Sequence, residues 1–465
     1  MREGTTLTNP RTDLILENNR AHVFHSWSAQ RRPNPVAVAG GAGCWFWDTE
    51  GRRYLDFSSQ LVYTNLGHQH PALVAAIRAQ ADRLCTVAPA FANEARGELA
   101  RLIAERAPGD LDMVFFTNGG TDANENAVRM ARLHTGRLKV LSAYRSYHGA
   151  TAASITMTGD PRRWGAEPGV PGVVHFMGPY LYRSAFFATT EAEESERALA
   201  HLRQVIEFEG PASVAAVLLE TVVGTNGVLV PPPGYMAGVR SLCDEFGIMM
   251  ICDEVMAGFG RVGEWFAVQA WDVTPDLITF AKGVNSGYVP LGGVVISRKV
   301  AETFYDRPYP GGLTYSGHPL ACAAGVASIE VFEESGLLAH VRDLGERVVR
   351  PVLDVIAETH PSVGEVRGRG LLWAIELVRD RSTKEMLVPF NASGASNEPM
   401  AKLANRCHEL GVWPFTHFNR LHVAPPLVIS EQELRQGLEQ VDQALEVADS
   451  YVGTAAGTGE LVANR

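Results

Sequence analysis

Short apolar runs alternate with longer stretches of helical periodicity between residues 71 and 330. Seven of these runs are almost continuously apolar, which is typical of strands buried on both faces of a mainly parallel sheet. The predicted strands are Met113–Phe116, Lys139–Ala143, Val173–Phe176, Val214–Leu219, Ile248–Cys252, Leu277–Phe280 and Gly293–Ile296. Two of the helical stretches are Ala72–Asp82 and Glu94–Glu105. The pattern predicts the α/β class, with a large domain built on a mainly parallel seven-stranded sheet.

Both ends of the chain depart from this alternation. A β-hairpin is predicted over Gly43–Phe57, because two aromatic-rich strands flank a turn at Asp48-Thr49-Glu50-Gly51. After residue 330 the pattern predicts a long helix to about Glu358, a β-type segment over Val366–Leu377, helices over Met400–Leu410 and Glu431–Ser450, and a strand near Leu421–Ala424. We therefore expect a large domain over residues 66–330, and a smaller α+β domain formed by residues 1–65 and 331–465.

The composition limits the kinds of partner that the protein can bind and the cellular compartment in which it works. With 465 residues, 46% of them hydrophobic, the chain is long enough for two or three domains with buried cores. Its net charge of −11 argues against nucleic-acid binding, and no run approaches the roughly 18 apolar residues of a membrane span. Six scattered cysteines without a CxxC pair, and a polar segment Met1–Leu16, predict a cytoplasmic protein with free thiols and no metal site.

A candidate phosphate site lies in the segment Phe115–Glu125, where a predicted strand leads through two glycines into a predicted helix. Glycines let backbone N–H groups approach an anion closely, and the helix adds its positive end. Gly120 and Thr121 would be the donors. The alternative is a plain strand-to-helix turn with Thr121 as the helix cap, because this arrangement is common.

Two predicted strands end in groups that suit pyridoxal phosphate. Lys282 follows the strand Leu277–Phe280, and Asp253 follows the strand Ile248–Cys252. This cofactor needs a lysine to hold its aldehyde and an acid to keep its ring nitrogen protonated. Taken alone, Lys282 could merely reach solvent. Asp253 with the adjacent acid could instead bind Mg²⁺ in an NTPase, but the chain has no Gly-x-x-x-x-Gly-Lys-Ser/Thr loop.

An aromatic residue follows a third strand. Tyr147 comes after Lys139–Ala143, at the sheet edge where ligands bind in open α/β folds, and its ring could stack on a pyridine ring. The alternative is a tyrosine that only packs in the core. Together the motifs resemble those of class III aminotransferases among the fold-type-I pyridoxal-phosphate enzymes, and especially taurine–pyruvate aminotransferases. The stretches that carry the resemblance are Thr117–Glu125, Tyr147–Gly149, Cys252–Arg261, Ala281–Gly283 and Leu313–Pro319.

The resemblance implies a role for each group around the cofactor ring. Lys282 would attach the cofactor and then act as the general base at the substrate Cα. Asp253 would hold the ring nitrogen. Tyr147 would stack on one face of the ring, and Val255 would support the other.

The resemblance also implies roles at the edges of the cofactor. Gly120 and Thr121 would hold its phosphate, and Glu220 would lie near its hydroxyl edge. Thr314 would reach the phosphate from the neighbouring subunit of a homodimer, or of a tetramer built from such dimers. We therefore expect a homo-oligomer with shared active sites.

The implied activity is transfer of an amino group from an amine or ω-amino acid, such as taurine or β-alanine, to a keto acid such as pyruvate. An aminomutase or a decarboxylase of this fold would use the same Lys282 and Asp253. A non-catalytic cofactor-binding regulator is a third alternative. The first ~65 residues lack the basic helix-turn-helix pattern that such a regulator would carry.

The residues expected on the substrate side of the site differ from those of related amine transaminases. Phe415 stands where many amine:pyruvate members have an arginine for the substrate carboxylate. Arg420 could supply that cation by another route, or it could be a surface arginine on a loop. Arg145 and Arg163 are further candidates. On the other side of the pocket we expect Gln60 and Val62, where many amine transaminases have a tryptophan.

Overall fold

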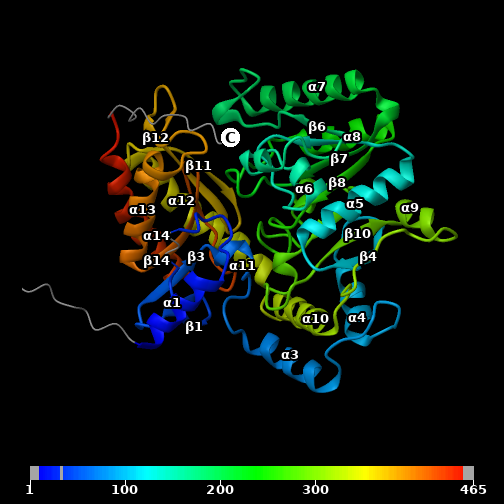
Figure 1. Cartoon of the computed structure of the whole chain (residues 1–465). Helices are drawn as coiled ribbons and strands as arrows, with labels where there is room; N and C mark the ends of the chain where they lie inside the picture. Colours follow the sequence, from blue (N-terminus) through cyan, green and yellow to red (C-terminus); the bar gives the residue numbers. More distant parts are fainter. Residues whose placement is uncertain (1–9, 32–34, 454–465) are drawn as a thin grey trace, which may run out of the picture.

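A seven-stranded sheet forms the centre of the larger lobe (Figure 1) in the computed structural model, which describes residues 10–31 and 35–453. The strand order is β4-β10-β9-β8-β7-β5-β6, and β10 runs antiparallel to both of its neighbours while the other pairs are parallel. The bounds are β4 Leu111–Thr117, β5 Lys139–Ala143, β6 Val173–Phe176, β7 Val214–Glu220, β8 Met249–Asp253, β9 Leu277–Phe280 and β10 Gly292–Ser297. All seven predicted strands and the mainly parallel sheet are confirmed.

Helices cover both faces of this sheet, because successive strand residues point to opposite sides. Ala216 and Leu218 of β7 pack in one apolar cluster with α5 (Gly120–Thr135), whereas Val217 and Leu219 pack in another with α7 (Glu191–Glu209) and α8 (Tyr235–Phe246). The second cluster also includes α4 (Glu94–Ala104) and α10 (Pro319–Glu334), and α3 (Pro71–Arg83) packs on α10. Within the described residues, no helix is both long and apolar enough to cross a membrane.

The smaller lobe contains an eight-stranded sheet with strands from both ends of the chain, drawn blue and orange in Figure 1. The predicted hairpin is confirmed as β2 and β3, and β3 pairs in parallel with β14. The bounds are β1 Val38–Ala42, β2 Trp45–Asp48, β3 Arg53–Phe57, β11 Val363–Arg369, β12 Leu372–Asp380, β13 Glu385–Met386, β14 Val412–His417 and β15 Arg420–Val423. Helices α12 (Arg350–Thr359), α13 (Glu398–Leu410) and α14 (Glu431–Asp449) pack beside it. The domain limits near residues 65 and 330 stay predictions.

Three segments of the C-terminal part differ from the prediction. The expected long helix is interrupted at Gly336, whose left-handed φ of 58° ends one helix and begins α11 (Leu337–Leu344). The expected single β-type segment is two antiparallel strands, β11 and β12, that turn at Gly370 with φ 57°. Strand β14 was not predicted, because Pro414 and four polar or aromatic neighbours mask its apolar pattern.

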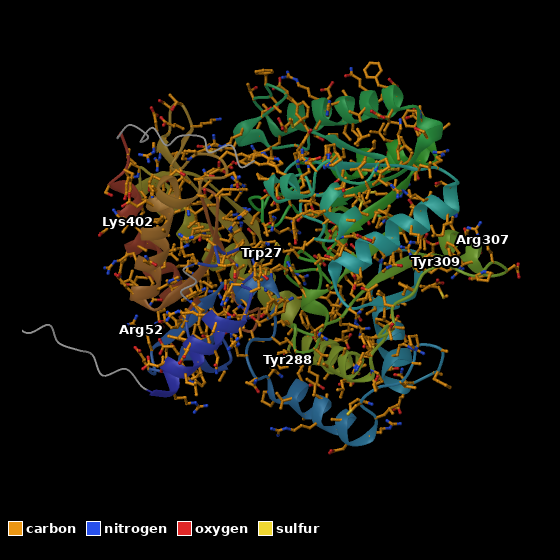
Figure 2. The ribbon with its side chains drawn as sticks, viewed as in Figure 1. Trp27, Arg52, Tyr288, Arg307, Tyr309 and Lys402 are labelled. Atoms are coloured by element: carbon orange, nitrogen blue, oxygen red, sulfur yellow. The ribbon has the colours of Figure 1, made fainter. Side chains whose placement is uncertain are left out.

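Buried polar contacts join the two lobes next to the sheet edge. Arg261 has no exposed surface and donates to Pro425 O at 2.6 Å and to Asn65 Oδ1 at 2.7 Å. Tyr288 lies where the chain enters α3 (Figure 2), and its hydroxyl donates to Gly67 O at 2.8 Å. These contacts fix the loop that follows Lys282 against the N-terminal part of the chain.

Candidate active site

The carboxyl ends of the parallel strands and the start of α5 surround a cavity of about 360 Å³. That volume lies within the range of roughly 300–1,000 Å³ that is usual for cofactor and ligand sites. The cavity brings together seven of the residues singled out in the sequence: Gly120, Thr121, Tyr147, Glu220, Asp253, Val255 and Lys282. The strand-end argument therefore located one common site from residues far apart along the chain.

Lys282 begins a short 3₁₀ turn directly after β9 and has a left-handed φ of 45°. This conformation is costly for a residue with a side chain, and it persists because the surrounding structure fixes it. Burial lowers the pKa of Lys282 to about 8, although Asp253 and Glu220 pull it upward. A substantial fraction of the amine is therefore neutral near physiological pH, which a lysine needs to attack an aldehyde.

Asp253 ends β8 and is almost fully buried, with both carboxylate oxygens in hydrogen bonds. Its Oδ2 accepts from Asn124 Nδ2 at 2.8 Å and lies 2.8 Å from His148 Nδ1, and its Oδ1 accepts from Val255 N at 3.0 Å. Because a carboxylate only accepts, the proton of His148 lies on Nδ1. Each carboxylate oxygen can take about two donors, so Oδ1 retains room for one N–H group from the cavity.

Asn124 and His148 form a support for Asp253 that the sequence did not reveal. Asn124 also donates to His148 O at 2.8 Å and accepts from Thr279 Oγ1 at 2.7 Å. The sequence placed His148 beside Tyr147 but gave it no role. A usable pattern was present, since Asn124 follows Thr121 by one helical turn and lies on the otherwise apolar buried face of α5.

The start of α5 provides the groups for a phosphate. Gly119 is extended and α5 begins at Gly120, so the first N–H groups of this helix have no partner within it. A Cβ on Gly120 would lie 2.8 Å from both methyl groups of Val255, so only glycine lets the two segments approach this closely. The Thr121 hydroxyl, which accepts from Ala150 N at 3.3 Å, lines the same cavity. Free donors at a helix start suit a phosphate dianion.

Glu220 and Tyr147 are linked at the opposite wall. Glu220 accepts from Tyr147 N at 2.9 Å and from Gly224 N at 2.7 Å, and burial raises its pKa to about 7. The guanidinium of Arg162 lies 3.7 Å from the centre of the Tyr147 ring and donates to Thr225 Oγ1 at 2.9 Å. Thr225 also lines the cavity. Arg162 is thus a cation beside the site that the sequence analysis missed.

The candidate substrate residues are not among the cavity walls. Gln60 donates to Asp56 Oδ2 at 2.9 Å, and Val62 is buried in an apolar cluster, while their neighbour Tyr63 does line the cavity. Arg420 lies on β15 and is 1% exposed, so the alternative of a surface arginine on a loop is wrong. Its Nε lies 3.7 Å from Glu376 Oε2, and Nε and Nη1 have no hydrogen-bond partner among the described residues.

Thr314 lies outside the cavity of its own chain. It is exposed in the segment that leads to α10. Earlier in that segment, Tyr309 anchors the chain to α5 at the edge of the lobe (Figure 2), with its hydroxyl 2.7 Å from Asn126 Oδ1. Arg145 and Arg163 line a different cavity next to this one.

Comparison with known proteins identifies the family. Residues 27–445 match the family model for class III aminotransferases. The chain belongs to the class III aminotransferases. It is 35% identical to 4-aminobutyrate aminotransferase of Escherichia coli, over 89% of this chain and 94% of that protein. It is also 35% identical to taurine–pyruvate aminotransferase of Rhodobacter capsulatus, over 93% of this chain and 96% of that protein.

Solved structures agree with this assignment. A taurine:2-oxoglutarate aminotransferase of Bifidobacterium kashiwanohense, solved with pyridoxal phosphate and glutamate, is 43% identical with a TM-score of 0.91 and covers 97% of this chain and 100% of its own. An (S)-enantioselective omega-transaminase of Thermomicrobium roseum is 37% identical with a TM-score of 0.89, over 95% and 99% of the two chains. The predicted fold-type-I aminotransferase fold and the family are confirmed.

This aminotransferase uses pyridoxal phosphate, as its family does. The cavity fits that cofactor on three independent counts. A buried lysine with a lowered pKa lies at one end, a carboxylate with a free acceptor position lies at the far wall, and unpaired N–H groups lie at the start of α5. A glycine at the one position where a side chain would collide with Val255 completes the cradle.

Proposed function

We propose that this aminotransferase moves the amino group of an ω-amino acid or aminosulfonate, such as β-alanine or taurine, to a keto acid such as pyruvate. The observation that carries the proposal is the guanidinium group of Arg162 beside the Lys282 cavity. Arg162 pairs with Asp160 and contacts the cavity residues Tyr147 and Thr225. Arg420 does not line the cavity, but it is buried and two of its nitrogens lack hydrogen bonds among the described residues. Cations beside the site suit a donor that carries an acid group at the end remote from its amine.

The relatives support this choice of substrate class. Taurine–pyruvate aminotransferases at 30–35% identity cover nearly the whole chain, and a taurine:2-oxoglutarate aminotransferase is a structural neighbour at 43% identity. A purely hydrophobic amine has no oxyanion that a guanidinium group could bind.

In the proposed mechanism, the chain's own groups move protons and hold charges. When bound, pyridoxal phosphate supplies an aldehyde for the amino group and a ring that takes up electrons from Cα. Lys282 would hold the cofactor, yield its place to the donor amine, and then carry the proton from the donor Cα on Nζ. Asp253 would keep the ring nitrogen protonated, and the hydrogen bonds from Asn124 and His148 would hold its carboxylate in position.

The other cavity residues would position the cofactor. Gly120 and Thr121 would hold its phosphate, Tyr147 and Val255 would support the two ring faces, and Glu220 would lie at the hydroxyl edge. Release of the first product before the keto acid binds gives a ping-pong reaction. The same residues then act in the reverse order on the keto acid.

A donor screen tests the substrate class. Taurine, β-alanine, 4-aminobutyrate, a diamine and 1-phenylethylamine are each supplied with pyruvate, and then with 2-oxoglutarate, to purified holoenzyme. We expect the acidic ω-amines to have kcat/KM values at least tenfold above those of 1-phenylethylamine and the diamine. A preference for 1-phenylethylamine or the diamine would refute the substrate class while leaving the family assignment intact.

Two arginine variants test which cation holds the acid group. The KM values of Arg162→Met and of Arg420→Met should each be compared with those of the wild type, with taurine and with 1-phenylethylamine as donors. If one guanidinium binds the acid group, its loss should raise the KM for taurine and for pyruvate by tenfold or more. The KM for 1-phenylethylamine should barely change. Equal small effects on both donors would remove that arginine from the substrate site. Gln60 and Val62 stay second-line candidates, because only their neighbour Tyr63 lines the cavity.

We further propose a homodimer that completes each site with Thr314 of the partner subunit, acting in the cytoplasm. Support comes from the exposure of Thr314 on its own chain and its absence from the cavity lining. A tetramer of such dimers would preserve the same sites. Sedimentation of the purified holoenzyme distinguishes these assemblies.

A further inference from the structure

A second cavity of about 390 Å³ lies beside the Lys282 cavity, and Glu220 is the residue that lines both. Its walls come from the loop after β5, the 3₁₀ turn at residues 161–166, the segment 177–185, the loops after β7 and the start of α8. Phe390 of the smaller lobe closes one side. None of the roles proposed for the cofactor or its substrates uses this space.

Arg145 gives this cavity a cation without a partner. No hydrogen bond or ion pair of the described residues involves its guanidinium, which lies 5.2 Å from the centre of the Tyr180 ring. Burial lowers the pKa of Arg145, Tyr180 and the Glu376 carboxylate raise it, and the nearby Arg183 and Arg367 lower it further. A half-buried cation that lies near other cations is costly unless an anion offsets it.

Two further arginines line the same space. Arg183 pairs with Glu376 through Nε at 2.5 Å, but its Nη2 is buried and has no hydrogen-bond partner among the described residues. Arg163 is bonded through Nε to Glu167 at 3.1 Å. The cavity therefore holds several N–H donors that are not committed to the protein.

The acidic residues of the cavity are already engaged. Asp160 accepts from Arg162 Nε at 2.9 Å and from Asn226 Nδ2 at 3.0 Å. Both oxygens of Glu220 accept backbone N–H groups, and burial raises its pKa to about 7. The uncommitted charge that faces the cavity is consequently positive.

The remaining walls are largely apolar. They include Ala143, Trp164, Met177, Leu219, Leu229 and Phe390. A ligand that fits both surfaces has an apolar body and one planar or tetrahedral oxyanion, since the guanidinium fork binds such groups through two parallel hydrogen bonds. We propose that this cavity binds a small organic monoanion, a carboxylate or sulfonate with an apolar body, at a site separate from the Lys282 cavity.

Calorimetric titration of the holoenzyme tests the proposal, with benzenesulfonate as the probe. The cofactor is first blocked with aminooxyacetate, so that the Lys282 cavity is closed to the probe. We expect saturable binding in the millimolar range or tighter, at least tenfold weaker binding of uncharged benzenesulfonamide, and little binding of sulfate, which has no apolar body. Arg145→Gln should weaken benzenesulfonate binding at least tenfold, and Arg145→Lys should weaken it less.

Two further variants distinguish loss of binding at this site from general effects of a changed charge or of misfolding. Arg347→Gln removes an exposed arginine that does not line this cavity, and it should leave the affinity unchanged. Ala185→Trp fills the cavity from an exposed position without changing charge, and it should also abolish binding if Arg145→Gln does not fold. The proposal is overturned if the wild type shows no saturable binding, if benzenesulfonamide binds equally well, or if both cavity variants retain wild-type affinity. Binding that disappears on blocking the cofactor would place the probe in the Lys282 cavity and overturn a separate site.

Discussion

Replacing Asp253 by asparagine should slow the chemistry more than it destabilises the fold. The charged acceptor for the ring nitrogen becomes neutral, and a hydrogen bond to a charged group contributes about 1.5–3 kcal/mol. At ~1.36 kcal/mol per factor of ten, loss of that interaction in the transition state slows the half-reaction by roughly 10- to 150-fold. We expect the amide oxygen to keep the contacts of Oδ2 with Asn124 and His148.

The loss of stability comes from the Oδ1 position, which becomes the amide nitrogen in Asp253→Asn. The amide nitrogen would face the Val255 N–H, which now donates to Oδ1 at 3.0 Å, so one hydrogen bond is lost. We expect the free energy of unfolding to fall by about 1–2 kcal/mol. This loss is small beside the usual stability of a domain, and the variant should remain folded at 25 °C.

A single-turnover measurement separates the two effects. Holoenzyme is mixed with excess donor in a stopped-flow instrument, and the change in cofactor absorbance gives the rate of the first half-reaction. Glu254→Gln is the matched control, because Glu254 is the next residue and is equally buried but bonds Thr221 Oγ1 at 2.6 Å and Ala267 N at 2.7 Å, away from the cavity. The Glu254→Gln variant should have a lower free energy of unfolding and an unchanged rate of the first half-reaction. A rate within twofold of wild type for Asp253→Asn, or equal slowing in both variants, would refute the role of Asp253.

Three further outcomes are expected. Lys282→Ala should abolish turnover but not folding, and borohydride reduction of wild-type holoenzyme should fix the cofactor to Lys282 in a peptide map; an adduct on another lysine would contradict this. Because burial lowers the pKa of Lys282 to about 8, the rate at which apoenzyme takes up the cofactor should rise roughly tenfold from pH 7 to pH 9, as the amine loses its proton, and a flat profile would count against it. Mixed subunits carrying Lys282→Ala and Thr314→Ala should regain activity, since one site of each heterodimer then has neither defect; no recovery despite subunit exchange would exclude a shared site.

Most of the large lobe could be predicted from the sequence because its strands are apolar on both faces. Each such run stands out from its neighbours, and the residue that follows it lies at a known edge of the sheet. The order of the apolar runs was therefore enough to place Asp253 and Lys282 together. In the smaller lobe, β14 escaped prediction because Trp413, Pro414 and Phe415 give no clean alternation.

The support around Asp253 was harder to predict because it depends on tertiary contacts. Asn124 and His148 belong to α5 and to the loop after β5, and only the packing of the helix on the sheet brings them to one carboxylate. Arg162 was missed for a similar reason. It follows a glycine- and proline-containing turn with no periodic pattern, and its side chain reaches Tyr147 across space.

The arginines show most clearly where a linear pattern stops being informative. Arg420 was the first candidate for the acid-binding role, and Arg145 and Arg163 were further candidates, because the sequence does not show which arginine enters the pocket. The structure separates them: the first two face a neighbouring cavity, and Arg420 is buried against Glu376. Chain order fixes which edge of a sheet a residue reaches, whereas the direction of a long side chain depends on which carboxylates and rings lie within its reach. An acid-binding arginine in this family therefore has to be assigned from the partners of each guanidinium, and those that lack partners are the ones to test for ligands.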